Sequence, residues 1–260
     1  SLVMDVNKNS YTFLFAIIMV VLVAALLSIA AIQLKPHQSK NIELEKMQNI
    51  LSSIGKNVDR ETAEILYNEI ITSEIVLNSK GELVEGNAFD IDLSSEMKKD
   101  VDNQLFPLFI SELNNKKKYI VPLRGKGLWG PIWGFIAIEE DLNTVFGAVF
   151  DHKSETPGLG AEINQDFFQD PFRGKNIFDE KNNFKSILVK KGGAEKDDKY
   201  AVDAISGGTI TCDGVTNMLY ERLDKYIVYF DKLKMKNLNS DSIFELDSNT
   251  LVLLNNFRYE

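Results

Sequence analysis

The sequence predicts an α+β fold, in which a single N-terminal transmembrane helix precedes a mixed, mainly antiparallel β-sheet domain with peripheral helices. Residues 11–34 carry no charge, residues 117–151 are rich in β-branched and aromatic side chains, and residues 212–230 space their apolar side chains as a helix does. We expect a tail at 1–10, the transmembrane helix at 11–34, a stalk and an N-terminal α/β part at 35–115, the main sheet domain at 116–230, and a C-terminal extension at 231–260.

The apolar run at 11–34 is long enough to cross a membrane. As a helix it extends about 36 Å, against a hydrocarbon core of roughly 30 Å. A cleaved signal peptide is the alternative, because Ser28-Ile29-Ala30 resembles a cleavage site, but the run is longer than a typical signal core. The span contains no ionisable side chain, so we interpret it as an anchor or packing element and not as a path for ions.

The segments after the span alternate between helical and strand patterns. Residues 35–56 look like a polar stalk that continues the membrane helix, and 59–71 predict a short amphipathic helix with Asp59 as its cap. A further helix is expected near 95–104 and another at 212–230, while 231–260 is ambiguous. Strands are predicted at 74–78, 117–125, 132–140, 143–151, 186–193 and 199–208.

Charge and cysteine content exclude several functions. The formal net charge of −9 repels phosphate backbones, so we expect no nucleic-acid partner. The chain has one cysteine, which excludes an internal disulfide and a cysteine-based zinc or iron–sulfur site within the chain. His37 and His152 are too few for a histidine-rich site, so no metal site is predicted.

Three glycine-rich segments, at 125–134, 152–163 and 202–215, are candidates for a binding site. In the third, a strand is expected to end at Asp203, a tight turn to run from Ser206 to Thr209, and a helix to begin near Thr211. A helix start offers free N–H groups and a positive dipole end, which suit a phosphate beside the hydroxyls of Ser206, Thr209 and Thr211. An ordinary helix cap after a glycine turn is the alternative.

The second segment carries a turn signal. Pro157-Gly158 has the residue preference of a type II turn, and Leu159 between Gly158 and Gly160 lets the backbone lie flat against a planar ligand. Glu155 and Thr156 add hydrogen-bonding groups. An ordinary surface loop is the alternative.

Other conspicuous residues have structural interpretations. Trp129 and Trp133 of the first segment are four residues apart and favour packing in the core or at a membrane interface. His152 by itself is typical of a structural or solvent-facing histidine, and Cys212 of a bystander, because no second cysteine can resolve it. The segments contain no Ser-His-Asp spacing, phosphate-binding Walker loop or dinucleotide fingerprint.

Taken in order, several motifs resemble the NqrC family, the C subunits of the sodium-translocating NADH:quinone reductase. The matching motifs are GKGLW at 125–129, ETPGLGAE at 155–162, GKNIFDE at 174–180, VKKGGA at 189–194 and DAISGGTIT at 203–211. The resemblance covers about residues 10–225, including the single N-terminal span. Residues 226–260 carry no matching motif.

The resemblance implies a covalent cofactor. In this family FMN is joined by a phosphoester to the threonine of a D-x-x-S-G-A-T motif, and a separate flavin transferase installs it. Here the motif runs from Asp203 to Thr209, with Gly208 where the family has alanine. Both residues are small, so we expect the turn to survive. Thr209 is then the FMN acceptor, and Asp203, Ser206 and Gly207 form the transferase recognition site.

The same resemblance implies that residues 116–230 form an FMN-binding domain in which further residues contact the cofactor. These are expected to be Leu128, Trp129, Glu155, Thr156, Gly158, Leu159, Gly160, Gly208 and Thr211. No catalytic residue is expected, because the flavin supplies the redox chemistry.

The resemblance also implies partners and a location. Such a protein passes electrons between other redox subunits of a membrane respiratory complex during NADH oxidation, quinone reduction and sodium export, and does not oxidise NADH on its own. The lysines around the span, Lys8 before it and Lys35, Lys40 and Lys46 after it, weakly favour a cytoplasmic domain. The resemblance implies the periplasmic side of the bacterial inner membrane, which we adopt because four lysines are a small sample.

Three other functions fit part of the pattern. The G subunit of the related ferredoxin:NAD⁺ electron-transport complex shares the anchor and the flavin motif, although its redox partners differ. A membrane-anchored ligand-binding domain without a redox role suits the anchor and the sheet. A free-standing flavin reductase is disfavoured, because the chain has no dinucleotide fingerprint.

Overall fold

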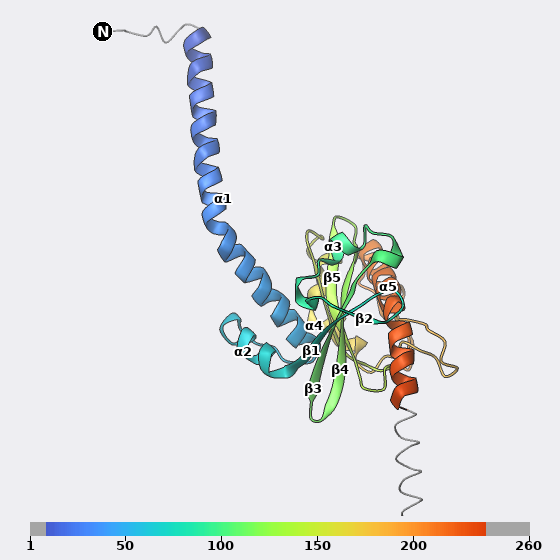
Figure 1. The fold of residues 1–260 in the computed structure, drawn as a ribbon. Helices are drawn as coiled ribbons and strands as arrows, with labels where there is room; N and C mark the ends of the chain where they lie inside the picture. The colour runs from blue at the N-terminus through green and yellow to red at the C-terminus, as the bar shows by residue number, and fades with distance from the viewer. Residues whose placement is uncertain (1–8, 238–260) are drawn as a thin grey trace, which may run out of the picture. The chain divides into compact units, whose positions relative to one another are not determined.

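The computed structural model describes residues 9–237 of the chain, which divides into two compact units, Ser1–Met47 and Gln48–Glu260. The described part of the first unit belongs to α1 (Asn9–Ser53), a helix long and apolar enough to cross a membrane, whose residues 12–34 are exposed. α1 continues through Pro36 without interruption (Figure 1). The predicted stalk therefore begins as a continuation of the apolar helix.

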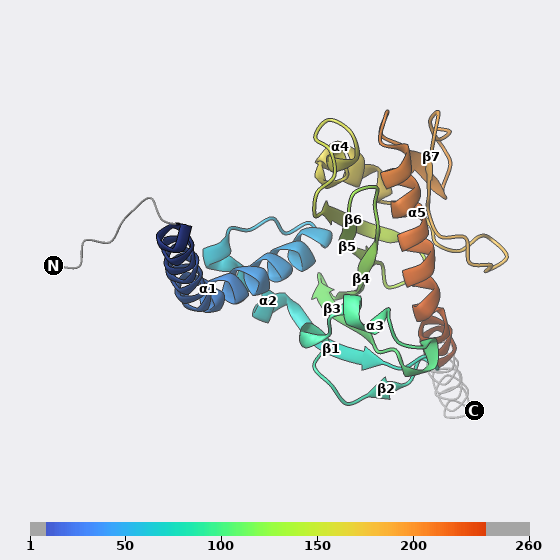
Figure 2. The ribbon, with the colours of Figure 1, turned by 90° about the horizontal axis from the view of Figure 1, so that it is seen from above.

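A six-stranded antiparallel sheet forms the centre of the second unit. Its strand order is β2-β1-β3-β4-β5-β6 (Figure 2). The strands are β1 (Ile71–Leu77), β2 (Leu83–Val84), β3 (Phe106–Leu113), β4 (Lys116–Lys126), β5 (Pro131–Ile138) and β6 (Val145–His152). Representative pairs are Phe109↔Ile120, Val121↔Ile136 and Ile136↔Ala148. A separate parallel pair joins β7 (Leu188–Lys190) to β8 (Ala201–Asp203), so the predicted mixed, mainly antiparallel fold is confirmed.

The main core lies between this sheet and α5 (Thr209–Leu223). It combines alternate residues of the central strands with one face of the helix, including Tyr119, Val121, Leu123, Ile132, Ile136, Val215, Met218, Leu219 and Leu223. The intervening residues Phe109, Ile120 and Phe135 are also buried but lie outside this cluster. The central strands are therefore buried on both faces, which explains why their sequences are continuously apolar.

The short helix predicted at 59–71, just before the first strand, is confirmed as α2 (Arg60–Ile70). It begins after Asp59, whose carboxylate accepts hydrogen bonds from the backbone N–H (2.9 Å) and the hydroxyl (2.7 Å) of Thr62. The predicted cap is thus confirmed. β1 starts at the residue after α2, three residues earlier than the predicted strand.

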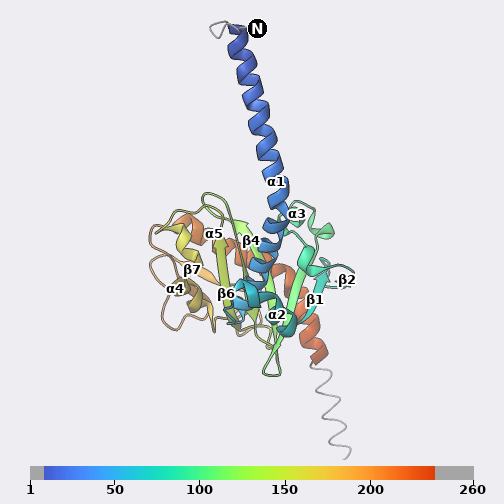
Figure 3. The same ribbon diagram turned by 90° about the vertical axis from the view of Figure 1, so that its left-hand side faces the viewer.

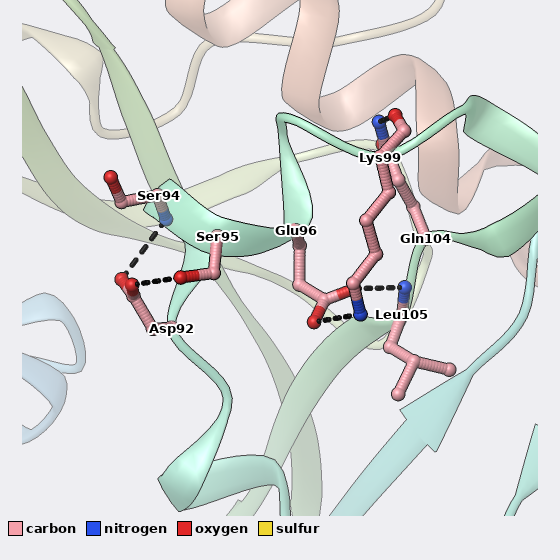
Figure 4. Close-up of polar contacts among 7 residues, drawn as sticks. All are labelled: Asp92, Ser94, Ser95, Glu96, Lys99, Gln104 and Leu105. Carbon is pink, nitrogen blue, oxygen red and sulfur yellow. Dashed lines mark hydrogen bonds and ion pairs between the residues drawn. The ribbon is translucent and has the colours of Figure 1, made fainter.

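The prediction of a single helix near 95–104 is wrong. The chain forms α3 (Leu93–Glu96), a turn, and a 3₁₀ turn η2 (Val101–Asn103). Side chains of this segment bond to other groups of the same segment (Figure 4). The Glu96 carboxylate accepts hydrogen bonds from the Lys99 ammonium and the Leu105 N–H. The Gln104 amide donates to the Lys99 carbonyl. Polar side chains that satisfy nearby backbone groups compete with a continuous helix.

No strand was predicted from the sequence where β3 lies. Its segment FPLFISEL lacks polar alternation and contains Pro107, which removes a backbone donor. Pro107 lies opposite Val76 of β1. It is tolerated because the pairing of β3 with β4 begins only at Phe109, so that pairing requires no N–H from residue 107. The strands predicted at 186–193 and 199–208 are also shorter than expected, since β7 and β8 have three residues each.

Short helices cover the edge of the sheet at β6. α4 (Asp166–Gln169) lies beside this strand (Figure 3), between the 3₁₀ turns η3 (Gly160–Asn164) and η4 (Asp170–Phe172). The Gln169 side-chain amide donates to the carbonyls of Phe150 in β6 (3.0 Å) and Ile163 in η3 (3.1 Å). The bond to Phe150 satisfies a backbone acceptor that an edge strand otherwise leaves open.

The helix predicted at 212–230 is confirmed but starts three residues earlier. A 3₁₀ turn, η5 (Asp224–Tyr226), follows α5, and residues 227–237 are helical up to the last described residue. Tyr226 is buried, and its hydroxyl donates to the carbonyl of Pro107 in β3 (2.7 Å). Most of the expected C-terminal extension, 238–260, lies outside the described residues.

We expect Tyr226→Phe to lower the free energy of unfolding by about 1–2 kcal/mol, because the Pro107 carbonyl would lose its buried hydrogen-bond donor. Urea unfolding of the full chain in detergent, followed by circular dichroism, measures this change. Tyr220→Phe is the control, since Tyr220 is 52% exposed. Equal effects from the two substitutions would contradict a stabilising hydrogen bond at Tyr226.

Candidate functional site

The third glycine-rich segment forms the strand–turn–helix unit that the sequence predicts. β8 ends at Asp203, and Gly207 adopts a φ of +76°, which favours glycine. The Gly208 N–H donates to the Ile205 carbonyl (3.0 Å), closing the turn. α5 begins directly afterwards at Thr209, two residues before the start expected near Thr211 from the turn and three before the apolar helical spacing that begins at 212.

The start of α5 has no side-chain cap. Gly208 occupies the capping position, no side-chain hydrogen bond is made there, and the first turn contains no acidic residue. Thr209, at the first helical position, is half-buried. The positive end of the helix dipole and first-turn N–H groups therefore lie beside the Thr209 hydroxyl.

The second glycine-rich segment forms the predicted turn and packs against the third. The Leu159 N–H donates to the Thr156 carbonyl (3.1 Å), and Gly158 has a φ of +75°. A Cβ on Gly207 would lie only 2.5 Å from a methyl carbon of Leu159. The two segments thus meet at a contact that requires glycine at position 207.

A buried carboxylate joins all three glycine-rich segments. Glu155 is 4% exposed, and its Oε2 accepts a hydrogen bond from the Thr211 hydroxyl (2.5 Å) in the first turn of α5. Its Oε1 accepts from the backbone N–H of Trp129 (2.8 Å). The sequence predicted Glu155 and Thr211 as ligand contacts, but the structure pairs their polar groups with each other.

Two glycines make room for this carboxylate. A Cβ on Gly127 would lie 2.5 Å from Glu155 Oε1, and a Cβ on Gly160 would lie 2.8 Å from Oε2 and 2.2 Å from the Thr211 hydroxyl oxygen. All of these distances are too short for a carbon atom. Neither position tolerates a side chain unless the Glu155–Thr211 pair moves.

The environment keeps Glu155 ionised. Burial alone would raise the pKa of its carboxyl, but the hydrogen bond from Thr211 and those from the backbone of residues 128–130 outweigh burial and lower this pKa below its ordinary value. The carboxylate is thus a fixed negative charge beside the start of α5.

These segments enclose a cavity of about 190 Å³. Its lining contains Ile210 and nine residues that the sequence assigned to cofactor contact or attachment: Leu128, Glu155, Thr156, Leu159, Gly160, Gly207, Gly208, Thr209 and Thr211. Three apolar side chains of this lining, Leu128, Leu159 and Ile210, are 40–56% exposed and form an apolar rim. The site therefore combines an open helix start with an exposed apolar surface.

The remaining predicted residues lie outside the cavity. Asp203 borders a different cavity of about 280 Å³, and its carboxylate accepts a hydrogen bond from the Ala194 N–H (2.6 Å). Ser206 and Gly158 are exposed. Trp129 is 67% exposed, so it does not pack in the core, while packing at a membrane interface and contact with the cofactor stay predictions.

Sequence reasoning missed Gly127 and Ile210. Ile210 could have been predicted to line the site, because it is an apolar residue directly after the proposed acceptor threonine. The space that Gly127 leaves for Glu155 could not, because it depends on tertiary contact alone. His152 helps to position Glu155, because its Nδ1 accepts a hydrogen bond from the Glu155 N–H (3.2 Å). Cys212 is buried in the first turn of α5, and its sulfur accepts a hydrogen bond from the Ile205 N–H (3.3 Å).

The sequence is similar to those of known proteins. Residues 127–224 match the FMN-binding domain family. The chain is 31% identical to the C subunit of the Na⁺-translocating NADH-quinone reductase of Vibrio alginolyticus, over 73% of this chain and 80% of that protein. It is also 31% identical to the corresponding C subunit of Haemophilus ducreyi, over 81% of this chain and 89% of that one.

Solved structures agree with the sequence comparisons. The crystal structure of the C subunit from Parabacteroides distasonis is 43% identical, with a TM-score of 0.71 over 75% of this chain and 96% of that one. NqrC from Shewanella oneidensis is 27% identical, with a TM-score of 0.64 over 75% and 99% of the two chains. With its relatives matched over most of their length, the chain belongs to the NqrC family, the C subunits of the Na⁺-translocating NADH-quinone reductase.

Proposed function

We propose that this chain carries FMN esterified through its phosphate to Thr209 and passes electrons between other redox subunits of a sodium-translocating NADH:quinone reductase. The observation that carries the proposal is the position of Thr209. Its hydroxyl lies at an uncapped helix start, in a DAISGGT segment, on a cavity shared with the TPGLG turn. Membership of the family makes the chain a subunit of an oxidoreductase complex.

The residues of the site fit a tethered flavin. Cavities that enclose a cofactor commonly measure roughly 300–1,000 Å³, so a cavity of about 190 Å³ accepts only part of one. First-turn N–H groups suit the phosphate, and the apolar rim suits a planar aromatic ring. When bound, FMN supplies the electron-accepting and electron-donating chemistry.

Each residue of the site then has a specific role. Thr209 provides the ester oxygen, and Gly207 and Gly208 let the backbone approach the phosphate closely. Leu128, Leu159 and neighbouring rim residues exclude water from one side of the ring. Asp203 and Ser206, exposed beside the acceptor, are available to a flavin transferase during maturation.

The remaining features concern location and partners. α1 anchors the chain as a single pass in the bacterial inner membrane, supported by its length and its exposed apolar side chains. The second unit lies on the periplasmic side, where it meets the other subunits of the complex. NADH is oxidised at another subunit, in keeping with the absence of a dinucleotide fingerprint from this sequence.

Mass spectrometry of the Thr209 peptide from native membranes tests the proposal. We expect that peptide to carry the additional mass of one FMN less one water. In a denaturing gel the flavin should fluoresce with the polypeptide band, which distinguishes a covalent carrier from a ligand-binding domain without redox function. An unmodified peptide from cells that make the transferase would refute the attachment.

A further inference from the structure

The electrostatics of the cavity are unfavourable for a free phosphate. Among the described residues that line it, Glu155 is the one charged side chain, and none is lysine, arginine or histidine. Sites that hold phosphate reversibly usually add a cationic side chain to the backbone N–H groups. Here the cavity at the helix start contains a negative charge instead.

Glu155 cannot turn away from this position. Both of its carboxylate oxygens are hydrogen-bonded, Oε2 to the Thr211 hydroxyl and Oε1 to the Trp129 N–H. Gly127 and Gly160 enclose it so closely that a Cβ at either position would collide with it. Glu155 and Thr209 line the same cavity of about 190 Å³, so the fixed charge and the acceptor share one small enclosure.

We propose that Glu155 is a specificity-determining residue that excludes free FMN from the acceptor site, so that flavin is retained there only as the ester of Thr209. This inference rests on the proposed function. A phosphate monoester carries about −1.5 to −2 charges at pH 7, whereas the phosphodiester formed with Thr209 carries a single negative charge. The repulsion from Glu155 is therefore larger for free FMN than for the attached group, and an unmodified acceptor stays vacant until the transferase acts.

Binding measurements on a chain that cannot be modified test this directly. The full chain with Thr209→Val, made without the transferase and held in detergent, is titrated with FMN and with riboflavin, which lacks the phosphate. Flavin fluorescence and equilibrium dialysis report both affinities. The same titrations are made after adding Glu155→Gln, which preserves the shape and one hydrogen-bond acceptor but removes the charge.

Glu162→Gln is the matched control. Glu162 belongs to the same loop, and its carboxylate accepts a hydrogen bond from the Gly158 N–H (2.8 Å), but it does not line the cavity. Removing its charge changes the net charge of the chain by the same amount. It should leave the ratio of FMN affinity to riboflavin affinity unchanged.

We expect Glu155→Gln to raise that affinity ratio at least about tenfold, because juxtaposed like charges weaken binding strongly, with a larger effect at low salt. A purely structural role for Glu155 would instead lower both affinities together. An unchanged ratio, or no detectable FMN binding after Glu155→Gln, would overturn the inference. The attachment itself is tested separately by the mass of the Thr209 peptide, so a failure here leaves that result standing.

Discussion

Thr209→Val is expected to reduce covalent flavin to an undetectable level while the chain still folds. Valine has nearly the shape of threonine and the same branching at Cβ, and residue 209 is only half-buried, so the fold should lose less than about 1 kcal/mol. The missing hydroxyl, by contrast, removes the oxygen to which we propose that the phosphate is joined. Intact mass and in-gel fluorescence of the denatured polypeptide measure the loss.

Two further variants make the result specific to the hydroxyl of residue 209. Thr209→Ser keeps an oxygen at that position and should retain flavin. Ser206→Ala removes a neighbouring exposed hydroxyl and should reduce attachment without abolishing it. Flavin fluorescence that persists in the denatured Thr209→Val chain would show that the acceptor is another residue.

Gly160→Ala is expected to disrupt the site through packing. The new Cβ would lie 2.2 Å from the Thr211 hydroxyl oxygen and 2.8 Å from Glu155 Oε2, so the two side chains must separate. Overpacking and the loss of a buried hydrogen bond to a carboxylate together should lower the free energy of unfolding by about 3 kcal/mol. Urea unfolding of the full chain measures the loss, and flavin incorporation should fall with it.

Gly158→Ala provides the matched control from the same turn. A Cβ on Gly158 meets nothing within 4 Å, but the φ of +75° is unfavourable for alanine. Left-handed backbone costs a non-glycine residue about 1 kcal/mol or somewhat more, so the loss should be clearly smaller than for Gly160→Ala. If both variants are equally destabilised, the crowding around Glu155 is not what makes glycine necessary at position 160.

Much of this fold could be predicted, because its signals are local. The uncharged run at 11–34 predicted an apolar helix, and the Asp59 cap marked the start of α2. The helix expected near 95–104 failed because Glu96 and its neighbours bond to the backbone of their own segment. β3 was missed because a strand buried on both faces shows no alternation and because Pro107 argues against a strand.

The acceptor turn was predictable for similar reasons. Consecutive glycines before a helical pattern indicated an open helix start, and the structure has such a start at Thr209. The bond between Glu155 and Thr211 was not predictable, since it links residues 56 positions apart. From sequence alone both residues were assigned to the ligand. Only tertiary structure shows that their polar groups are already paired.

The buried thiol of Cys212 can report on opening of the first turn of α5. It is the one thiol in the sequence, it is 1% exposed, and burial raises the pKa of that thiol, so alkylating reagents reach it only when the first turn of α5 opens. The rate of alkylation, divided by the rate for the unfolded chain, therefore gives the free energy of that opening without any engineered label. Comparing this rate before and after flavin attachment reveals how far modification rigidifies the turn.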